Sequence, residues 1–462
     1  MRTARGKTSA ALVVACLALA RGAAAQDAGP PAPAPAGPAA ASPGGASSSP
    51  TAPAAAQTTP PAAGLSPARL QQIQRALVRE KLDGWLFADF RRSDAIAYRL
   101  LGLDESGAHT RRWYCLIPAH GEPRKLLHAI EPRALDGVPG KAQTYASWRV
   151  RDRELGALLR DQKRIAMQYS PRNELPTVAK VDAGTLELVR SLGPAVVSSA
   201  DLVAELESTL SAAELASQAR AAELLSGDLE AVAQEAARRV REGNPASERE
   251  LQDFALARWA AEGLDAEGGR PGVAADAHSA DPHYSAAAQG SAKGERGSLL
   301  LLDFAARAGP GGIYGDLTRV YFLGDKVPSE IARVAALVFQ ARDAALEVFR
   351  AKAARGQLPT GAEVDTAARE VIAQAGQGER FLHRTGHNIG TRGHGDGVNN
   401  DDFETHDVRR HLPLTCFSIE PGVYLAGRFG VRSEIDVCLD AAGVPGLRGG
   451  PGQASVPALL AP

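Results

Sequence analysis

The sequence predicts an α+β protein preceded by a smaller α/β domain, and three observations support this prediction. The chain has 462 residues, enough for two domains and further segments. Up to about residue 208, short apolar segments typical of strands alternate with helical stretches. Beyond residue 209, long helical runs rich in Ala, Leu and Glu are segregated from apparently antiparallel apolar strands, which is the pattern of an α+β domain.

The amino terminus has the three-part layout of an export signal. Basic residues come first, then the apolar run SAALVVACLALA, then small residues before Gln26. We therefore expect residues 1–25 to be a signal peptide cleaved after Ala25, and the protein to be exported, either periplasmic or secreted. Two alternatives are less favoured. The apolar run is short for a transmembrane anchor, and lipoprotein anchoring through Cys16 fits poorly because apolar sequence continues past that cysteine.

Residues 26–64 consist almost wholly of Ala, Pro, Gly, Ser and Thr. Such a segment cannot bury enough apolar surface to offset its ordering entropy, so we expect a disordered linker. No later segment is apolar over a membrane-spanning length, and we expect the rest of the chain not to span a membrane. The chain has 52 Lys and Arg and 53 Asp and Glu, a net charge of -1, and it contains no basic run. We therefore also expect no nucleic-acid partner.

An α/β domain is expected over residues 65–208. Its first helix begins after Ser66, a capping residue, with Pro67 in the first turn and apolar residues at helical spacing, and it ends near Gly84. A second helical stretch reads VDAGTLELVRSLG. Short strands are predicted over residues 85–90, 113–118, 125–130 and 164–169.

The second domain is expected over residues 209–445. Ser211 and Glu214 form a potential capping box before a long helical run, and helices continue to about residue 264. Two more helices are predicted within PSEIARVAALVFQARDAALEVFRAKAA and GAEVDTAAREVIAQAG. Apolar strands are predicted over residues 297–305, 316–324, 415–425 and 430–439. We expect residues 446–462 to form a flexible tail.

Four acidic residues stand in or beside these strands: Asp303, Asp316, Glu420 and Glu434. A carboxylate buried there is costly unless a positive group meets it. Each one alone is explained by a Lys or Arg partner, by a turn or by a solvated face. Four together favour a multivalent cation, and two divalent ions would balance their charge. Oxygen-rich coordination with one imidazole suits manganese, cobalt, iron or zinc, and paired ions are suited to hydrolysing an amide.

Three of the ten histidines lie within HRTGHNIGTRGHG, at residues 383–395. The spacing of His383 and His387 matches one helical turn, but the four glycines of the segment argue against a stable helix. We therefore expect a loop and strand in which only one of the three histidines is a direct metal ligand. The histidines without such a context are interpreted as surface or structural residues: His109, His120, His128, His278, His406 and His411.

Four segments of the chain resemble the motifs of a known family. The segments DFAARAGPGGIYGDLTR, HRTGHNIG, FSIEPGVYL and GVRSE look like the ordered motifs of the pita-bread metallopeptidases of family M24. This family includes Xaa-Pro aminopeptidases, prolidases and methionine aminopeptidases. The resemblance covers residues from about 66 to 440, because the upstream domain also looks like the creatinase-type amino-terminal domain. It implies a carboxy-terminal pita-bread domain behind the smaller α/β domain.

The resemblance implies a set of five ligands that together bind two divalent metal ions. Asp303 would bind the first ion, and Asp316 and Glu434 would bridge both. His387 and Glu420 would bind the second ion, and Glu420 would also serve as general base toward a metal-bridging hydroxide. Manganese is the expected ion, with cobalt, zinc and iron as alternatives.

The resemblance also implies a substrate, a peptide with proline at P1′. His283, His383 and His394 match histidines that bind the scissile carbonyl and the proline side, and Arg432 matches an arginine near the site. The implied enzyme is an exopeptidase that hydrolyses Xaa-Pro bonds. Two alternatives remain open: a metal-dependent hydrolase or lyase acting on a small zwitterion, and a binding protein. Relatives are often dimers, so a homodimer is one expected arrangement. Dipeptides and longer peptides are not distinguished.

The sequence departs from the family in the spacing of two aspartates. It also leaves open whether two cysteines form a disulfide. Asp303 and Asp316 are thirteen residues apart, two more than the family usually has, which a longer hairpin turn absorbs without inverting a strand face. If Glu420 and Glu434 face each other across antiparallel strands, Cys416 and Cys438 do too. A disulfide is then conceivable, but we favour two buried free thiols.

Overall fold

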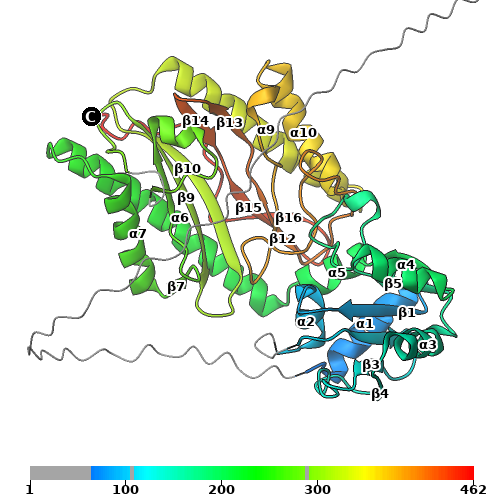
Figure 1. Ribbon diagram of the computed structural model, residues 1–462. Helices are drawn as coiled ribbons and strands as arrows, with labels where there is room; N and C mark the ends of the chain where they lie inside the picture. Colours follow the sequence, from blue (N-terminus) through cyan, green and yellow to red (C-terminus); the bar gives the residue numbers. More distant parts are fainter. Residues whose placement is uncertain (1–63, 105–108, 287–290) are drawn as a thin grey trace, which may run out of the picture. The chain divides into compact units, whose positions relative to one another are not determined.

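The computed structural model describes residues 64–104, 109–286 and 291–462 (Figure 1). The predicted export signal, the lipidation alternative at Cys16 and all but the last residue of the predicted linker lie outside these residues. Within the described part of the chain, no helix combines the length and the apolar character needed to cross a membrane.

The first sheet has six strands in the order β4-β3-β2-β1-β5-β6. The strands are β1 (Gly84–Asp89), β2 (Trp113–Pro118), β3 (Arg124–His128), β4 (Lys141–Tyr145), β5 (Arg164–Met167) and β6 (Ala195–Ser198). The sheet is mixed, because β1 pairs antiparallel with β2 and parallel with β5. The sequence predicted β1, β2, β3 and β5. It missed the two edge strands, because β4 is almost entirely exposed and β6 has only four residues, so neither carries a long apolar run.

Helices flank this sheet at α1 (Pro67–Arg79), α2 (Ala95–Leu101), α3 (Trp148–Leu159), η1 (Pro171–Asn173), α4 (Ala183–Ser191) and α5 (Ala200–Ser208). The predicted cap of α1 is present, since Ser66 Oγ accepts a hydrogen bond from the Arg69 amide at 3.1 Å. Its apolar face is buried in the core of this region through Ile73, Ala76 and Leu77.

The remaining helices are α6 (Ala212–Arg241), α7 (Glu248–Glu262), η2 (Asp276–Ala280), α9 (Ser329–Ala353), α10 (Gly361–Gln374) and η3 (Gly378–Arg380). Helix α6 begins at the predicted capping box, in which Ser211 and Glu214 exchange side-chain and backbone hydrogen bonds. It packs across β9 (Leu299–Ala308) and β10 (Tyr314–Phe322), while α9 and α10 pack against each other (Figure 1).

Strands β9 and β10 form the hairpin predicted around the first two acidic residues, joined on β9 by β7 (Leu264–Asp265) and β8 (Gly272–Ala275). Asp303 lies opposite Thr318, and Asp316 lies opposite Ala305. Residues opposite each other in an antiparallel pair point to the same face. Asp303 and Asp316 therefore share one face, as the argument about the longer turn predicted.

The two long strands predicted over residues 415–425 and 430–439 are wrong, because each is broken in the middle. The first divides into β12 (Cys416–Ile419) and β13 (Gly422–Leu425), and the second into β14 (Phe429–Arg432) and β15 (Ile435–Leu439). Strand β12 pairs with β15, with β11 (Asn388–Ile389) and β16 (Pro445–Arg448) outside them, whereas β13 and β14 form a separate pair. Pro421 lacks a ladder donor, which favours the break in the first segment.

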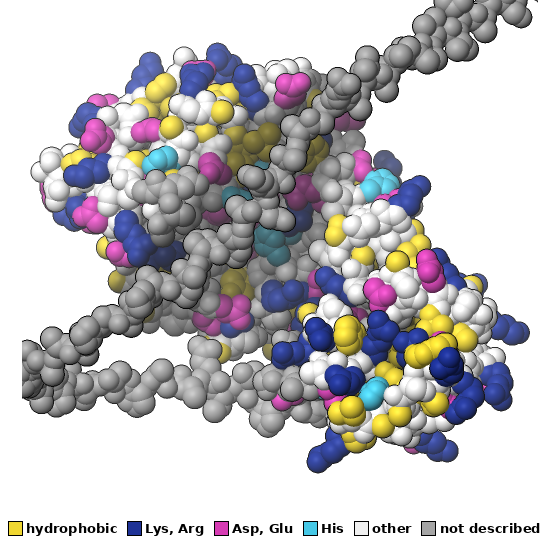
Figure 2. Space-filling model, viewed as in Figure 1, with side chains coloured by type: hydrophobic (Ala, Val, Ile, Leu, Met, Phe, Trp, Pro, Cys, Tyr) yellow, Lys and Arg dark blue, Asp and Glu magenta, His cyan; other side chains and the backbone are white. Residues whose placement is uncertain are grey.

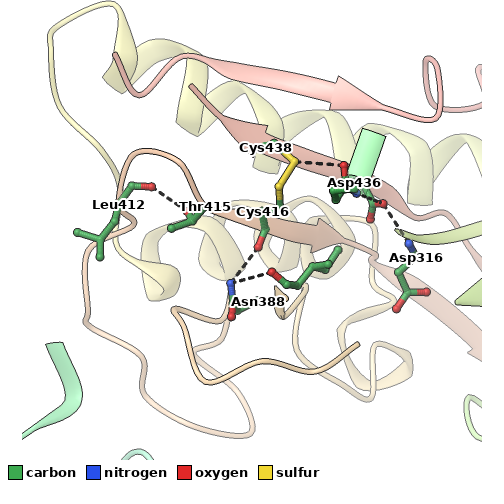
Figure 3. Close-up of a disulfide and its surroundings, with 9 residues drawn as sticks. Asp316, Asn388, Leu412, Thr415, Cys416, Asp436 and Cys438 are labelled. Atoms are coloured by element: carbon green, nitrogen blue, oxygen red, sulfur yellow. Dashed lines mark hydrogen bonds between the residues drawn. A yellow bond between two sulfur atoms is a disulfide. The ribbon is translucent and has the colours of Figure 1, made fainter. Parts of the chain in front are cut away.

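Cys416 and Cys438 are directly opposite each other in the β12–β15 pair. They form a disulfide (Figure 3), so the expectation of two free thiols is wrong. The register places their Cα atoms 4.1 Å apart, close enough for a bond despite the long intervening segment. Cys115 is free and buried.

The carboxy-terminal residues are not the expected flexible tail. Strand β16 pairs with β15, and the Phe322 amide of β10 donates a hydrogen bond to the Pro457 carbonyl at 2.9 Å. Leu459 and Leu460 are buried in the core formed by α6, α7 and β9. Apolar residues in this short segment cover the hairpin edge, and their burial keeps the segment in place.

Candidate metal centre and active site

Nine predicted site residues line one cavity of about 590 Å³. They are His283, Asp303, Asp316, His383, His387, His394, Glu420, Arg432 and Glu434. Histidine and acidic side chains also gather in the hollowed part of the face shown in Figure 2. The residues span 152 positions of sequence, from 283 to 434, and only the fold brings them together.

The hairpin supplies the first two carboxylates. Asp316 is buried, whereas Asp303 is partly exposed to the cavity. The Asp316 amide donates a 3.0 Å hydrogen bond to Oδ2 of Asp436, a buried residue of β15 that also accepts from Gln218 Nε2 at 2.7 Å (Figure 3). These bonds fix the backbone of Asp316 against the neighbouring sheet.

The other two carboxylates stand where the predicted strands break. Glu420 follows β12 and Glu434 precedes β15, so neither side chain has to obey the alternation of a continuous strand. The Glu420 amide donates to the Thr385 carbonyl at 2.7 Å, and the Glu434 amide donates to the Thr318 carbonyl at 3.2 Å. Both glutamates are therefore held by backbone hydrogen bonds to the elements that carry the other candidate ligands.

Close backbone packing holds the loop that carries His387. Ser418 on β12 donates its amide to the His387 carbonyl at 2.9 Å and accepts the His387 amide on its Oγ at 3.0 Å. A Cβ on Gly386 would lie 2.0 Å from the Ser418 carbonyl oxygen, so only glycine permits this approach. From α10, the buried Asp365 accepts hydrogen bonds from the Thr385 amide and hydroxyl at 2.9 and 2.7 Å.

His387 points its Nε2 atom into the acidic cluster. This atom lies 3.5 Å from Asp316 Oδ2 and 3.4 Å from Glu420 Oε1. The other ring nitrogen, Nδ1, lies 3.3 Å from the Asn388 carbonyl, which can only accept a hydrogen bond. Nδ1 therefore carries the proton, and Nε2 is the nitrogen available as a ligand.

Burial and neighbouring negative charges shift the pKa values of these groups. Burial and the charges of Asp316 and Glu420 raise the pKa of Glu434 well above its ordinary value. Burial raises the pKa of Asp316 to about 6. Burial opposes the charged form of His387, but the hydrogen bond to Asp316 and the Glu420 charge outweigh it and raise the pKa of that imidazole.

The residues fit a divalent metal site. Ligand atoms of Asp316, His387 and Glu434 lie within 4.8 Å of one another, and all three residues are buried. Oε1 of Glu434 is buried and has no hydrogen-bond partner among the described residues. An unpaired buried carboxylate oxygen among other carboxylates is what a bound cation would satisfy. The oxygen-rich set with one imidazole suits manganese, cobalt, iron or zinc.

His394 and His383 lie on either side of this cluster with different hydrogen bonding. The His394 ring stacks on the His387 ring at 3.9 Å, and its Nδ1 accepts from Arg384 Nη2 at 3.0 Å. The electrostatic interaction with His387, burial and the charge of Arg384 lower the pKa of His394 to about 3. His394 is thus a neutral imidazole whose Nε2–H can donate into the cavity.

His383 is less free than the sequence suggested. Its Nδ1 lies 2.8 Å from the Arg384 carbonyl and its Nε2 lies 2.7 Å from the Tyr424 hydroxyl, so both ring nitrogens have partners. His383 lines the cavity, but a substrate would have to compete with Tyr424 for its Nε2. His283 is exposed in the segment after η2 and also lines the cavity.

Sequence reasoning missed two side chains at the centre of the site. The Thr318 hydroxyl lies 2.9 Å from Asp303 and 2.8 Å from Glu434, and Tyr424 contacts both His383 and Arg432. The alternation of a strand gives a signal for Thr318, because it lies two residues after Asp316 and shares its face. No comparable signal marks Tyr424.

The histidines interpreted as surface or structural stay outside the cavity lining. His411 is fully buried and packs between Phe349 and Phe417, and His120 is exposed in the turn after β2. His278 is hydrogen bonded to the buried Glu248 at 2.9 Å.

An acidic cluster with one candidate histidine ligand, set in an α+β fold, is an arrangement suited to metal-dependent hydrolysis. Residues 220–441 match the model of metallopeptidase family M24. Among curated proteins, a 164-residue segment is 35% identical to the probable dipeptidase PepE of Mycobacterium bovis, covering 35% of this chain and 39% of that protein. A 172-residue segment is 31% identical to the Xaa-Pro dipeptidase of Pyrococcus furiosus, covering 36% of this chain and 44% of that protein.

The similarity to these curated relatives thus spans less than half of their length. Among solved structures, dipeptidase PepE from Mycobacterium ulcerans superposes with a TM-score of 0.60 at 24% identity, covering 84% of this chain and 97% of that one. At this identity the likeness concerns the fold, and it extends the pita-bread architecture and its amino-terminal domain over most of the chain.

Proposed function

We propose that this protein is a metal-dependent exopeptidase that hydrolyses Xaa-Pro peptide bonds with two divalent ions. One observation carries the proposal: the five candidate ligands Asp303, Asp316, His387, Glu420 and Glu434 line the same cavity as three further histidines and an arginine. The names of the similar proteins, a probable dipeptidase and an Xaa-Pro dipeptidase, agree with this substrate class.

The paired ions would supply an activated water and polarise the scissile carbonyl. Glu420 would take the proton from the attacking water and return it to the leaving amine. The charges of His387, His383 and Arg432 outweigh burial and lower the pKa of Glu420, which keeps it ionised and able to accept that proton.

His394 would stabilise the tetrahedral oxyanion. Because its Nδ1 accepts a hydrogen bond from Arg384, the remaining proton stands on Nε2, and the ring can donate into the cavity without carrying charge. His283 and His383 would contact the carbonyl and the P1′ proline side. The presence of both histidines in the lining of the same cavity supports that role.

The activity test uses the full chain with manganese or cobalt and compares Ala-Pro, Ala-Pro-Ala and Ala-Ala. We expect hydrolysis of the two proline peptides and little of Ala-Ala, with the ratio of the first two showing whether a dipeptide is preferred. His387→Ala should abolish activity, whereas His120→Ala, at an exposed histidine outside the cavity, should leave it unchanged. Metal-loaded protein that does not cleave any Xaa-Pro bond would refute the proposal.

The ligand assignment has a separate test by metal binding. Isothermal titration with Mn²⁺ should give close to two sites per chain for the wild type and a large loss of affinity for Glu434→Gln. Glu404→Gln is the matched control, because Glu404 lines the same cavity outside the candidate ligand set. Equal loss in both variants would show that general cavity charge, and not specific ligation, determines the binding.

We also propose that the protein is exported. The disulfide between Cys416 and Cys438 supports this, because such bonds persist in oxidising compartments. Amino-terminal sequencing of the protein from its native host should give Gln26 as the first residue. A mature chain that begins at Met1 in the cytoplasm would contradict the proposal.

A further inference from the structure

A buried carboxylate outside the candidate ligand set binds the chain segment around His283. Glu248 opens helix α7, is fully buried, and lies outside the cavity lining. A buried carboxylate is costly unless hydrogen bonds satisfy it, and its position at the first turn of a helix favours negative charge. Glu248 therefore needs hydrogen-bond donors around it.

Four donors from one chain segment converge on Glu248. Its Oε1 accepts from the Ala275 amide at 2.8 Å and from His278 Nδ1 at 2.9 Å. Its Oε2 accepts from the Tyr284 hydroxyl at 2.5 Å and from the Ala292 amide at 2.8 Å. These donors lie on both sides of His283 in the sequence, so the carboxylate holds the segment before and after that histidine.

The same segment is held on its other side by β14. The Gly430 amide donates to Ser279 Oγ at 2.8 Å, and a Cβ on Gly430 would lie 2.1 Å from the Ser279 carbonyl oxygen. Nη1 of Arg432 lies 3.3 Å from the Pro282 carbonyl, next to His283. The segment is thus clamped between α7 and the strand that leads to the acidic cluster.

Within the segment, the rings and the turn are also ordered. The His278 and Tyr284 rings stack at 4.2 Å, and both bind Glu248. The His283 amide donates to Asp281 Oδ1 at 3.0 Å, which shapes the turn that exposes His283 to the cavity. His283 itself has an exposed side chain, so its place depends on this framework and not on packing of its own ring.

We propose that Glu248 is a positioning residue that holds His283 at the substrate side of the cavity. This inference rests on the proposed function, in which His283 contacts the substrate. A carboxylate is required because all four partners are donors, and the amide group of a glutamine would direct its own N–H toward some of them. Metal ligation should not depend on Glu248, because none of its contacts involves a candidate ligand.

The first test is a double-mutant cycle of Glu248→Gln and His283→Ala with Ala-Pro as substrate. Glu248→Gln alone should lower kcat/KM by about 10- to 100-fold, as misplacement of a substrate-contacting group does. In the His283→Ala background it should change kcat/KM by no more than about twofold. Mn²⁺ affinity should stay the same. Independent effects of the two substitutions would overturn the proposal.

The matched control is Glu250→Gln, two residues further along the same helix. Glu250 caps α7 through Ser247 and also pairs with Arg239, and among the described residues none of its hydrogen bonds reaches the clamped segment. It should weaken α7 and leave kcat/KM within about twofold. A loss equal to that of Glu248→Gln would show that helix stability, and not the position of His283, is responsible. If Glu248→Gln does not fold, Tyr284→Phe removes one of the four donors and should give a smaller fall in kcat/KM that His283→Ala again masks.

A second readout does not need peptidase activity. Amide hydrogen exchange of residues 275–284 should become at least about tenfold faster in Glu248→Gln and stay unchanged in Glu250→Gln. If the wild type cleaves no Xaa-Pro peptide, the proposed function fails while the exchange result still decides whether Glu248 holds the segment. Unchanged exchange in Glu248→Gln would overturn the positioning role whatever the activity.

Discussion

Nη2 of Arg432 lies 2.5 Å from Oδ2 of Asp303, a carboxylate on a different sheet and 129 residues earlier in the chain. The guanidinium is buried, and it also donates from Nε to the Thr318 hydroxyl at 3.2 Å. A fixed cation thus stands at the edge of four carboxylates and orients Asp303, which is partly exposed. Arg432 supports the acidic cluster as well as facing the cavity.

Replacing this arginine by lysine should show that its geometry matters as well as its charge. A lysine keeps the charge but cannot bind Asp303 and Thr318 at once, and each charged hydrogen bond lost is worth about 1.5–3 kcal/mol. Arg432→Lys should therefore lower kcat/KM by at least about tenfold. The control is Arg428→Lys, at an exposed arginine paired with Glu330. Unchanged kinetics in Arg432→Lys would contradict the assignment.

Two glycines of the histidine segment should respond very differently to alanine. A Cβ on Gly386 would meet the Ser418 carbonyl oxygen at 2.0 Å, whereas a Cβ on Gly390 has no atom closer than 4.0 Å among the described residues. Gly386→Ala should cost about 1–3 kcal/mol of stability, as overpacking does, and weaken metal binding by displacing His387. Gly390→Ala should change neither by much. Urea denaturation and metal titration measure both, and equal tolerance at the two positions would contradict the packing argument.

The disulfide should stabilise the protein by restricting the conformations of the unfolded chain. Cys416 and Cys438 are 22 residues apart, and closing a loop of this length in the unfolded chain is worth about 3 kcal/mol. The double variant Cys416→Ser/Cys438→Ser should unfold at correspondingly lower urea concentration. Reducing agent should destabilise the wild type and leave the double variant unaffected. A wild type that is insensitive to reduction would show that the bond does not form.

His411 should make the protein less stable in acid. It is buried between aromatic rings and donates from Nε2 to Asn400 Oδ1 at 2.9 Å, and burial lowers its pKa to about 3. The unfolded chain has the ordinary pKa of about 6.5 and binds the additional proton first as the pH falls. Stability from this residue is therefore complete above pH 6.5 and is lost toward pH 3.

The measurable loss from His411 is about 2 kcal/mol between pH 7.5 and 5. His411→Gln keeps an amide donor but has no titrating group, so its unfolding free energy should fall less over the same interval. The difference between the two pH profiles isolates this residue from all other titrating groups. Parallel profiles would mean that His411 has the same pKa in the folded and unfolded protein, which would contradict the prediction.

The sequence predicted most helices, the hairpin of Asp303 and Asp316, and the residues that line the cavity. These features depend on local patterns: capping residues, apolar periodicity and short motifs in a fixed order. The sequence placed Cys416 opposite Cys438 only if Glu420 and Glu434 face each other, and its preference for two free thiols was wrong. Strand breaks were missed at Glu420 and Glu434, because a continuous apolar run does not reveal where the chain passes from one sheet to another.

Tertiary structure alone decided how the site is held together. Thr318 and Tyr424 enter it through contacts between sheets, His383 is engaged on both ring nitrogens, and Glu248 reaches the cavity only through the segment it clamps. The carboxy-terminal segment packs on the hairpin although its composition suggested a tail. The physical reason is the same in each case. The sequence by itself determined which side chains could carry the chemistry. Long-range hydrogen bonds and burial, which have no local pattern in the sequence, decided which residues contact those side chains and which of their atoms remain available to a substrate.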